Sequence, residues 1–186
     1  MNRFALVLSA VVVCAVPIHV TAQECTLQVK APSTARTFAR TTGQSQWKEF
    51  RNIGDVPALE LDHGMTAQFW EGQDSPRSVT TFEPGQDFSR SARYCFNGGG
   101  VLEGMSFEIR TELGWGFRAE GVVLKQGFAA RTQEFFDLDT GRPIAKPGGV
   151  GTVPIALKPT LYLKVSELPF ASLLATTTVA SNRQSR

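Results

Sequence analysis

Apolar and polar side chains alternate along the middle of the chain, from Val101 to Leu113. The apolar residues fall mainly on the odd positions, whereas positions 106, 108, 110 and 112 carry serine, glutamate, arginine and glutamate. Successive residues of a strand point to opposite faces of a sheet, so this pattern predicts a half-buried strand.

Glycine-rich turns divide the surrounding sequence into further segments of the same kind. The alternation resumes at Phe117–Lys125, and Phe128–Leu138 predicts another strand. Glycine reaches positive φ without strain, which favours tight turns at these breaks. The whole block from Arg93 to Ile144 therefore predicts an antiparallel meander of about four strands. The breaks are Asn97-Gly98-Gly99-Gly100, Gly114-Trp115-Gly116, Gln126-Gly127 and Asp139-Thr140-Gly141.

The flanking sequence is less regular. We expect a strand at Cys25–Lys30, one or two strands in Ala58–Trp70 divided at His63-Gly64, and a short helix around Asp87–Ala92. Residues Pro159–Leu174 predict a short helix, followed by an extended apolar segment, Leu168-Pro169-Phe170, pinned to the sheet.

Together these patterns predict a mainly β, β-rich α+β fold. We expect an antiparallel β-meander in a single domain, curled or partly closed, with one or two short helices.

The first 22 residues have the pattern of a secretory signal. A positive start at Arg3 precedes an apolar run, Phe4–Val16, which is shorter than the roughly 20 residues of a membrane span. We therefore expect cleavage after Ala22, a secreted or periplasmic location, and no transmembrane segment afterwards. Residues 23–175 would form the single domain, and the polar residues 176–186 a flexible tail.

Removal of the signal changes the cysteine count. Cys14 would leave with it, so Cys25 and Cys95 remain as a pair in an oxidising compartment. We predict a disulfide between them. The alternative is a catalytic thiol, which would need to stay reduced outside the cell.

Charge argues against two classes of partner. The chain carries 19 basic and 17 acidic residues. Without Arg3 the net charge falls to about +1, and the two signs are well mixed along the chain. This pattern indicates no basic surface for nucleic acid or for an anionic membrane.

Candidate catalytic chemistry is sparse. His63 would be the one histidine of the mature chain, and no G-x-S-x-G motif occurs. We therefore expect no metal site and no cofactor, and we assign no catalytic residue. One alternative stays open: Glu108, Glu112 and Glu120 fall on neighbouring predicted strands, and two of them could act as the acid and base of a glycosidase-like hydrolase.

Tryptophan supplies the candidate binding residues. Trp115 lies between two glycines and could project from a bulge as a stacking platform, and Trp70 could join it. No motif in the chain resembles a known family. We expect a non-catalytic domain that binds a partner protein or a small apolar or aromatic ligand. A carboxylate-dependent hydrolase and a structural envelope component are the alternatives.

Overall fold

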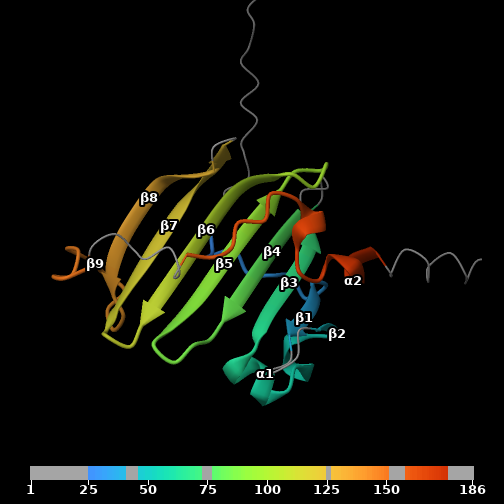
Figure 1. Ribbon diagram of the computed structural model, residues 1–186, viewed down its shortest axis with the longest axis horizontal. Coiled ribbons are helices and arrows are strands. Elements are labelled where there is room, and N and C mark those ends of the chain that lie inside the picture. Colours follow the sequence, from blue (N-terminus) through green and yellow to red (C-terminus); the bar gives the residue numbers. More distant parts are fainter. Residues whose placement is uncertain (1–24, 41–45, 73–76, 125–126, 151–157, 176–186) are drawn as a thin grey trace, which may run out of the picture.

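The structure, a computed structural model, describes residues 25–40, 46–72, 77–124, 127–150 and 158–175. These residues form one antiparallel sheet of nine strands in the order β2-β1-β3-β4-β5-β6-β7-β8-β9 (Figure 1). Strands β2 and β9 are its two edges, so the sheet is open. The mainly β fold predicted from the sequence is confirmed. The strands are β1 Arg36–Arg40, β2 Trp47–Phe50, β3 Met65–Glu71, β4 Arg77–Glu83, β5 Phe88–Phe96, β6 Leu102–Thr111, β7 Trp115–Leu124, β8 Gly127–Asp137 and β9 Pro143–Ile144.

The helices are short, as expected. Two α-helices, α1 (Ala58–His63) and α2 (Ala171–Ala175), are accompanied by the 3-10 turns η1 (Ile53–Asp55) and η3 (Val165–Glu167). They lie at the margins of the sheet in Figure 1.

The predicted meander is confirmed over β5 to β9, where each strand pairs with its neighbour in sequence. The turn before β6 closes with a hydrogen bond of 2.8 Å from the Gly100 amide to the Asn97 carbonyl. Gly100 has a φ of 76°, which explains why glycine is suited to this position. The turn between β8 and β9 falls at Asp139–Gly141, also as predicted.

Two of the expected elements are wrong. The segment expected as a helix at Asp87–Ala92 lies in strand β5 from Phe88 onward, because pairing with β4 and β6 on either side overrides its weak local pattern. The segment Cys25–Lys30 is not a strand. It turns on itself, with a 3.4 Å hydrogen bond from the Val29 amide to the Thr26 carbonyl.

The expectation for Ala58–Trp70 is half right. The division at His63-Gly64 is real, and β3 follows it, but the first half is helix α1. Pro57 precedes this helix as its N-cap, and its carbonyl accepts hydrogen bonds from Glu60 and Leu61. A proline at a helix start is favourable because its fixed φ suits the first turn.

The two faces of the sheet differ in chemistry. Tyr94, Phe107 and Phe117 are buried on one side, which we call the aromatic face. Their neighbours in sequence, among them Arg93, Glu108 and Arg118, point to the other side, which we call the polar face. This arrangement follows from the alternation seen in the sequence.

A C-terminal strap, residues 158–175, covers part of the aromatic face (Figure 1). The Phe170 ring stacks on Phe38 with centroids 4.5 Å apart. The hydroxyl of Tyr94 donates a 2.8 Å hydrogen bond to the Thr160 carbonyl. Leu168 and Phe170 are both buried. The predicted pinning of this apolar segment to the sheet is therefore confirmed.

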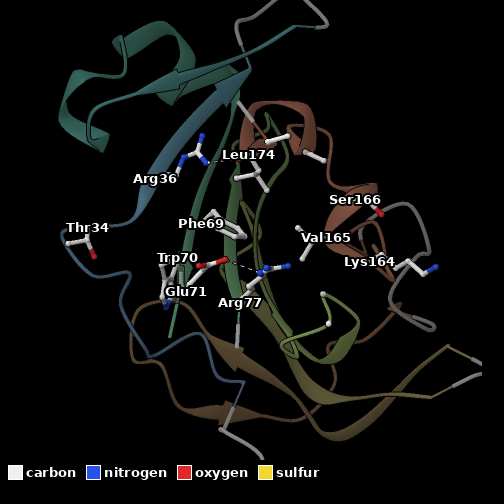
Figure 2. Close-up of a pocket in the computed structure, with 14 residues that line it drawn as sticks. Thr34, Arg36, Phe69, Trp70, Glu71, Arg77, Lys164, Val165, Ser166 and Leu174 are labelled. Atoms are coloured by element: carbon white, nitrogen blue, oxygen red, sulfur yellow. Dashed lines mark hydrogen bonds and ion pairs between the residues drawn. The ribbon is translucent and has the colours of Figure 1, made fainter. Parts of the chain in front are cut away.

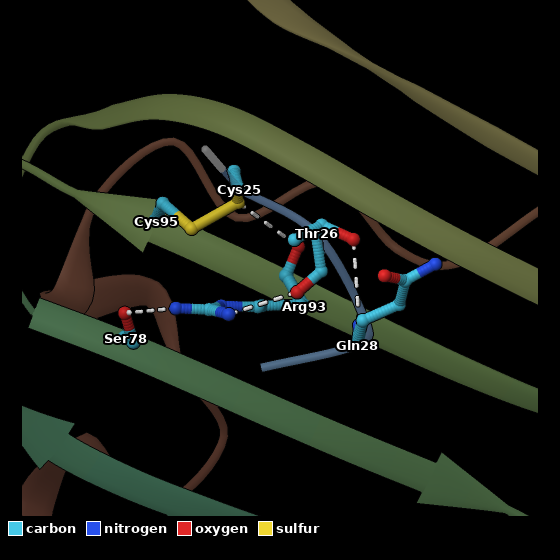
Figure 3. The surroundings of a disulfide bond; sticks show 6 residues. All are labelled: Cys25, Thr26, Gln28, Ser78, Arg93 and Cys95. Atoms are coloured by element: carbon cyan, nitrogen blue, oxygen red, sulfur yellow. Dashed lines mark hydrogen bonds between the residues drawn. A yellow bond between two sulfur atoms is a disulfide. The ribbon is translucent and has the colours of Figure 1, made fainter. Parts of the chain in front are cut away.

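An N-terminal strap, residues 25–35, lies on the polar face. The sulfur atoms of Cys25 and Cys95 are 2.09 Å apart, and the two Cα atoms 5.9 Å, which confirms the predicted disulfide (Figure 3). Beside it, Arg93 donates a 2.8 Å hydrogen bond from Nη1 to the carbonyl of Thr26. The disulfide and this hydrogen bond fasten the strap across β5.

Candidate functional site

The structure does not bring the two candidate tryptophans together. Trp70 lies near the end of β3, on the polar face, whereas Trp115 begins β7 on the aromatic face. Strands β3 and β7 run in the same direction, so the end of β3 and the start of β7 lie at opposite ends of the strands. No single ligand site can therefore be built from both.

Trp115 packs against the core. Its ring meets Phe135 edge-on at a centroid distance of 5.6 Å. Gly114 forms a hairpin turn with a φ of 80°, and the bulge of this strand occurs instead between Glu120 and Gly121. The expectation that a bulge makes the indole project from the sheet is therefore wrong.

Trp70 lines a cavity of about 810 Å³ (Figure 2). This hairpin-end cavity lies where β3 ends and β4 begins, beside the turn between β5 and β6 and the C-terminal strap. Its arginines are held by the protein itself. Arg77 pairs with Glu71 at 2.9 Å, and Arg36 binds both the Glu49 carboxylate and the Leu173 carbonyl. These guanidinium groups stabilise the walls of the cavity.

The Trp70 ring also has an internal partner. The guanidinium carbon of Arg93 lies 5.3 Å from the Trp70 ring centroid. Arg93 is fully buried, and burial lowers its pKa. Its Nη2 atom donates to Ser78 Oγ at 3.4 Å (Figure 3). Trp70 thus has a structural role in stabilising a buried cation, whatever it contributes to the cavity.

A second cavity, of about 490 Å³, lies on the aromatic face over β6, β7 and β8. Four phenylalanines line this aromatic cavity, together with Lys146 and Lys158. Both lysines are exposed. The rings belong to Phe107, Phe117, Phe128 and Phe135.

The rings of the aromatic cavity pack on one another. Phe107 lies 5.9 Å from Phe128, and Phe117 lies 5.1 Å from Phe135. Arg90 fixes one rim by donating a 2.8 Å hydrogen bond from Nη1 to the carbonyl of Lys158. Ring packing and this hydrogen bond therefore hold the walls of the cavity in place.

Of the three carboxylates proposed for a hydrolase, the structure brings two together. Glu108 and Glu120 line a groove of about 250 Å³ beside the N-terminal strap, which we call the strap groove. Glu112 is exposed at the end of the β6–β7 hairpin, outside that groove. Glu108 also pairs with Arg110 at 2.6 Å.

His63 and Asp137 lie outside the two cavities and the strap groove. His63 is exposed at the end of α1. Asp137 Oδ1 accepts hydrogen bonds from the amide and hydroxyl of Thr140, and these bonds lower its pKa. Within the described ranges, no group of three or more His, Cys, Asp or Glu side chains could hold a metal ion.

The aromatic cavity was missed by the sequence reasoning. The alternation in β7 and β8 does place Phe117, Phe128 and Phe135 in predicted strands. However, the cavity forms because the C-terminal strap covers only part of the aromatic face. The part over β7 and β8 stays uncovered beside the strap. No local pattern specifies that crossing point.

No helix in the described part of the chain is long and apolar enough to cross a membrane. Comparisons of the chain with protein-family models, with curated proteins and with solved structures give no match.

Proposed function

We propose that this protein is a non-catalytic binding domain whose ligand is a small apolar or aromatic molecule, held in the aromatic cavity. The observation that carries the proposal is the wall of four phenylalanine rings around a space of about 490 Å³. A volume in this range suits a small-molecule ligand, and such sites combine apolar walls with a few polar groups.

The polar groups at the rim favour a ligand that also carries an acidic group. Lys146 and Lys158 line the cavity and are exposed, so each can bring an ammonium group to its rim. Glu134 is the one acidic residue among its lining, and its carboxylate is bound to Arg118 Nε at 2.5 Å. An anion at the rim would therefore meet cations, while its apolar part contacts the rings.

Naphthalene-2-carboxylate is a suitable probe, with neutral 2-naphthalenemethanol for comparison. At about 0.3 kcal/mol per non-hydrogen atom, a probe of this size should bind with a Kd of about 1 mM. We expect Ala130→Trp to abolish this binding, because Ala130 is exposed and lines the cavity, so an indole there would fill it.

The control is Leu124→Trp, which adds an indole at an exposed position outside the cavity. Binding of both probes to Leu124→Trp, and of neither to Ala130→Trp, would support the proposal. Equal binding to both variants would refute the location. Replacing Lys146 and Lys158 with alanine should weaken the binding of naphthalene-2-carboxylate more than the binding of 2-naphthalenemethanol.

A carboxylate-dependent hydrolase stays the second candidate, because Glu108 and Glu120 line one groove. The ion pair between Glu108 and Arg110 works against it, because it already occupies one of the two carboxylates.

A further inference from the structure

The strap groove lies on the polar face, on the opposite side of the sheet from the aromatic cavity. Strand register brings its side chains together in two rows. Ser106 lies opposite Glu120, which lies opposite Thr132, and in the next row Arg118 lies between Glu108 and Glu134. All of them line the groove, and residues 26–28 of the N-terminal strap form its other wall.

The groove has an excess of negative charge. Three carboxylates line it against one guanidinium, that of Arg118. Arg118 is paired with Glu134, and Arg110, outside the groove, is paired with Glu108. Among the described residues, Glu120 forms no ion pair. Its carboxylate is therefore free to accept a charged donor.

Ser106 gives an independent indication of a ligand. Its side chain is 3% exposed, and its Oγ atom has no hydrogen-bond partner in the described part of the chain. Buried hydroxyl groups are normally satisfied, by protein or by a bound molecule. Since Ser106 lines the groove opposite Glu120, a molecule in the groove can supply the missing partner.

We propose that the strap groove binds a small ligand carrying a primary ammonium group. An ammonium group has three donors and no acceptor. Glu120 would accept a charge-assisted hydrogen bond from it, and the hydroxyls of Ser106 and Thr132 would accept the others. The volume of about 250 Å³ limits the ligand to the size of a small amine. This site is independent of the aromatic cavity.

The test uses 1,4-diaminobutane and 1,4-butanediol, which match in length and differ in charge, titrated into the oxidised protein and followed by NMR. We expect the diamine to bind at least tenfold more tightly than the diol. Glu120→Gln should weaken binding of the diamine at least tenfold, because the bond to Glu120 joins two opposite charges. Ser106→Ala should weaken it about threefold, because the serine hydroxyl is a neutral acceptor.

The matched control is Glu112→Gln, which removes the same charge from an exposed position outside the groove. It should leave the affinity unchanged. Equal weakening by Glu112→Gln and Glu120→Gln would show a general charge effect and overturn the proposal, as would equal binding of diamine and diol or no binding of either. Thermal unfolding of each variant verifies that it is folded.

Discussion

The guanidinium of Arg93 lies over the indole of Trp70, 5.3 Å from the ring centroid, in a fully buried position. Its hydrogen bonds go to Thr26 and Ser78, and no described carboxylate pairs with it. A buried cation normally requires a counter-ion. Here the negative face of the aromatic ring and neutral acceptors take that place.

Trp70→Leu should therefore destabilise the protein through Arg93 as well as through lost packing. We expect the free energy of unfolding in urea to fall by about 2 kcal/mol, since a desolvated cation–π contact is worth up to about that much. Trp70→Phe keeps an aromatic face and should cost less. Equal losses in the two variants would show that Arg93 does not depend on the ring.

Phe170→Ala should detach much of the C-terminal strap. Phe170 is 1% exposed and contacts both Phe38 and Trp47. Removing a buried phenylalanine ring costs about 3–5 kcal/mol. Ser172→Ala, two residues away and exposed, is the control and should change the free energy of unfolding by less than about 0.5 kcal/mol. Hydrogen exchange over residues 158–175 would show whether the loss is local.

Gly116→Ala tests the packing between β7 and β8. A Cβ atom at Gly116 would overlap the ring of the buried Phe136, so the ring must shift. Overpacking of this kind costs about 1–3 kcal/mol. Gly148→Ala is the matched control, because a Cβ there meets open space. Similar melting temperatures for Gly116→Ala and the unmodified protein would contradict the close contact.

Alkaline pH should destabilise the fold through Tyr94. Burial, followed by the charge of Tyr162, raises the pKa of Tyr94 above its ordinary value of 10.0. The unfolded chain then ionises first, so the free energy of unfolding is unaffected below pH 10 and falls as the pH rises above it. The free energy of unfolding can fall by up to about 1.4 kcal/mol per pH unit for each tyrosine of this kind.

Tyr94→Phe should reduce this slope without abolishing it, because burial also raises the pKa of Tyr162. It should also lower the free energy of unfolding at pH 7 by about 1 kcal/mol, through loss of the hydrogen bond to Thr160. Urea titrations from pH 7 upward would measure both effects. An unchanged slope would show that Tyr94 ionises freely in the folded protein.

Elements that are marked by a local sequence pattern, such as alternation or a glycine turn, could be predicted from the sequence. Alternation and glycine turns are enough to predict strands β6 to β8, because both signals lie within the strands themselves or in the turns that join them. Strand β5 was mistaken for a helix at its beginning, where Ser89, Arg90 and Ser91 hide the alternation. Its true state depends on β4 and β6, which bond to it on both sides.

The candidate sites depend even more on distant contacts. The disulfide could be predicted from compartment and count alone. The positions of the aromatic cavity and the strap groove could not, since each is bounded by a strap that crosses the sheet from a distant part of the chain. Trp115 stood out in the sequence because of its flanking glycines, yet these serve a hairpin turn and the contact with Phe136.

The arrangement of the two straps has a consequence for folding kinetics. Every strand pair except β1–β3 joins sequence neighbours, so most of the sheet can form from successive hairpins, which are fast local events. The C-terminal strap is synthesised after all nine strands. Until it docks, the part of the aromatic face under Phe170 and Tyr162 is open to water. This interval, rather than the finished fold, is the stage at which we expect the nascent chain to be most prone to aggregation.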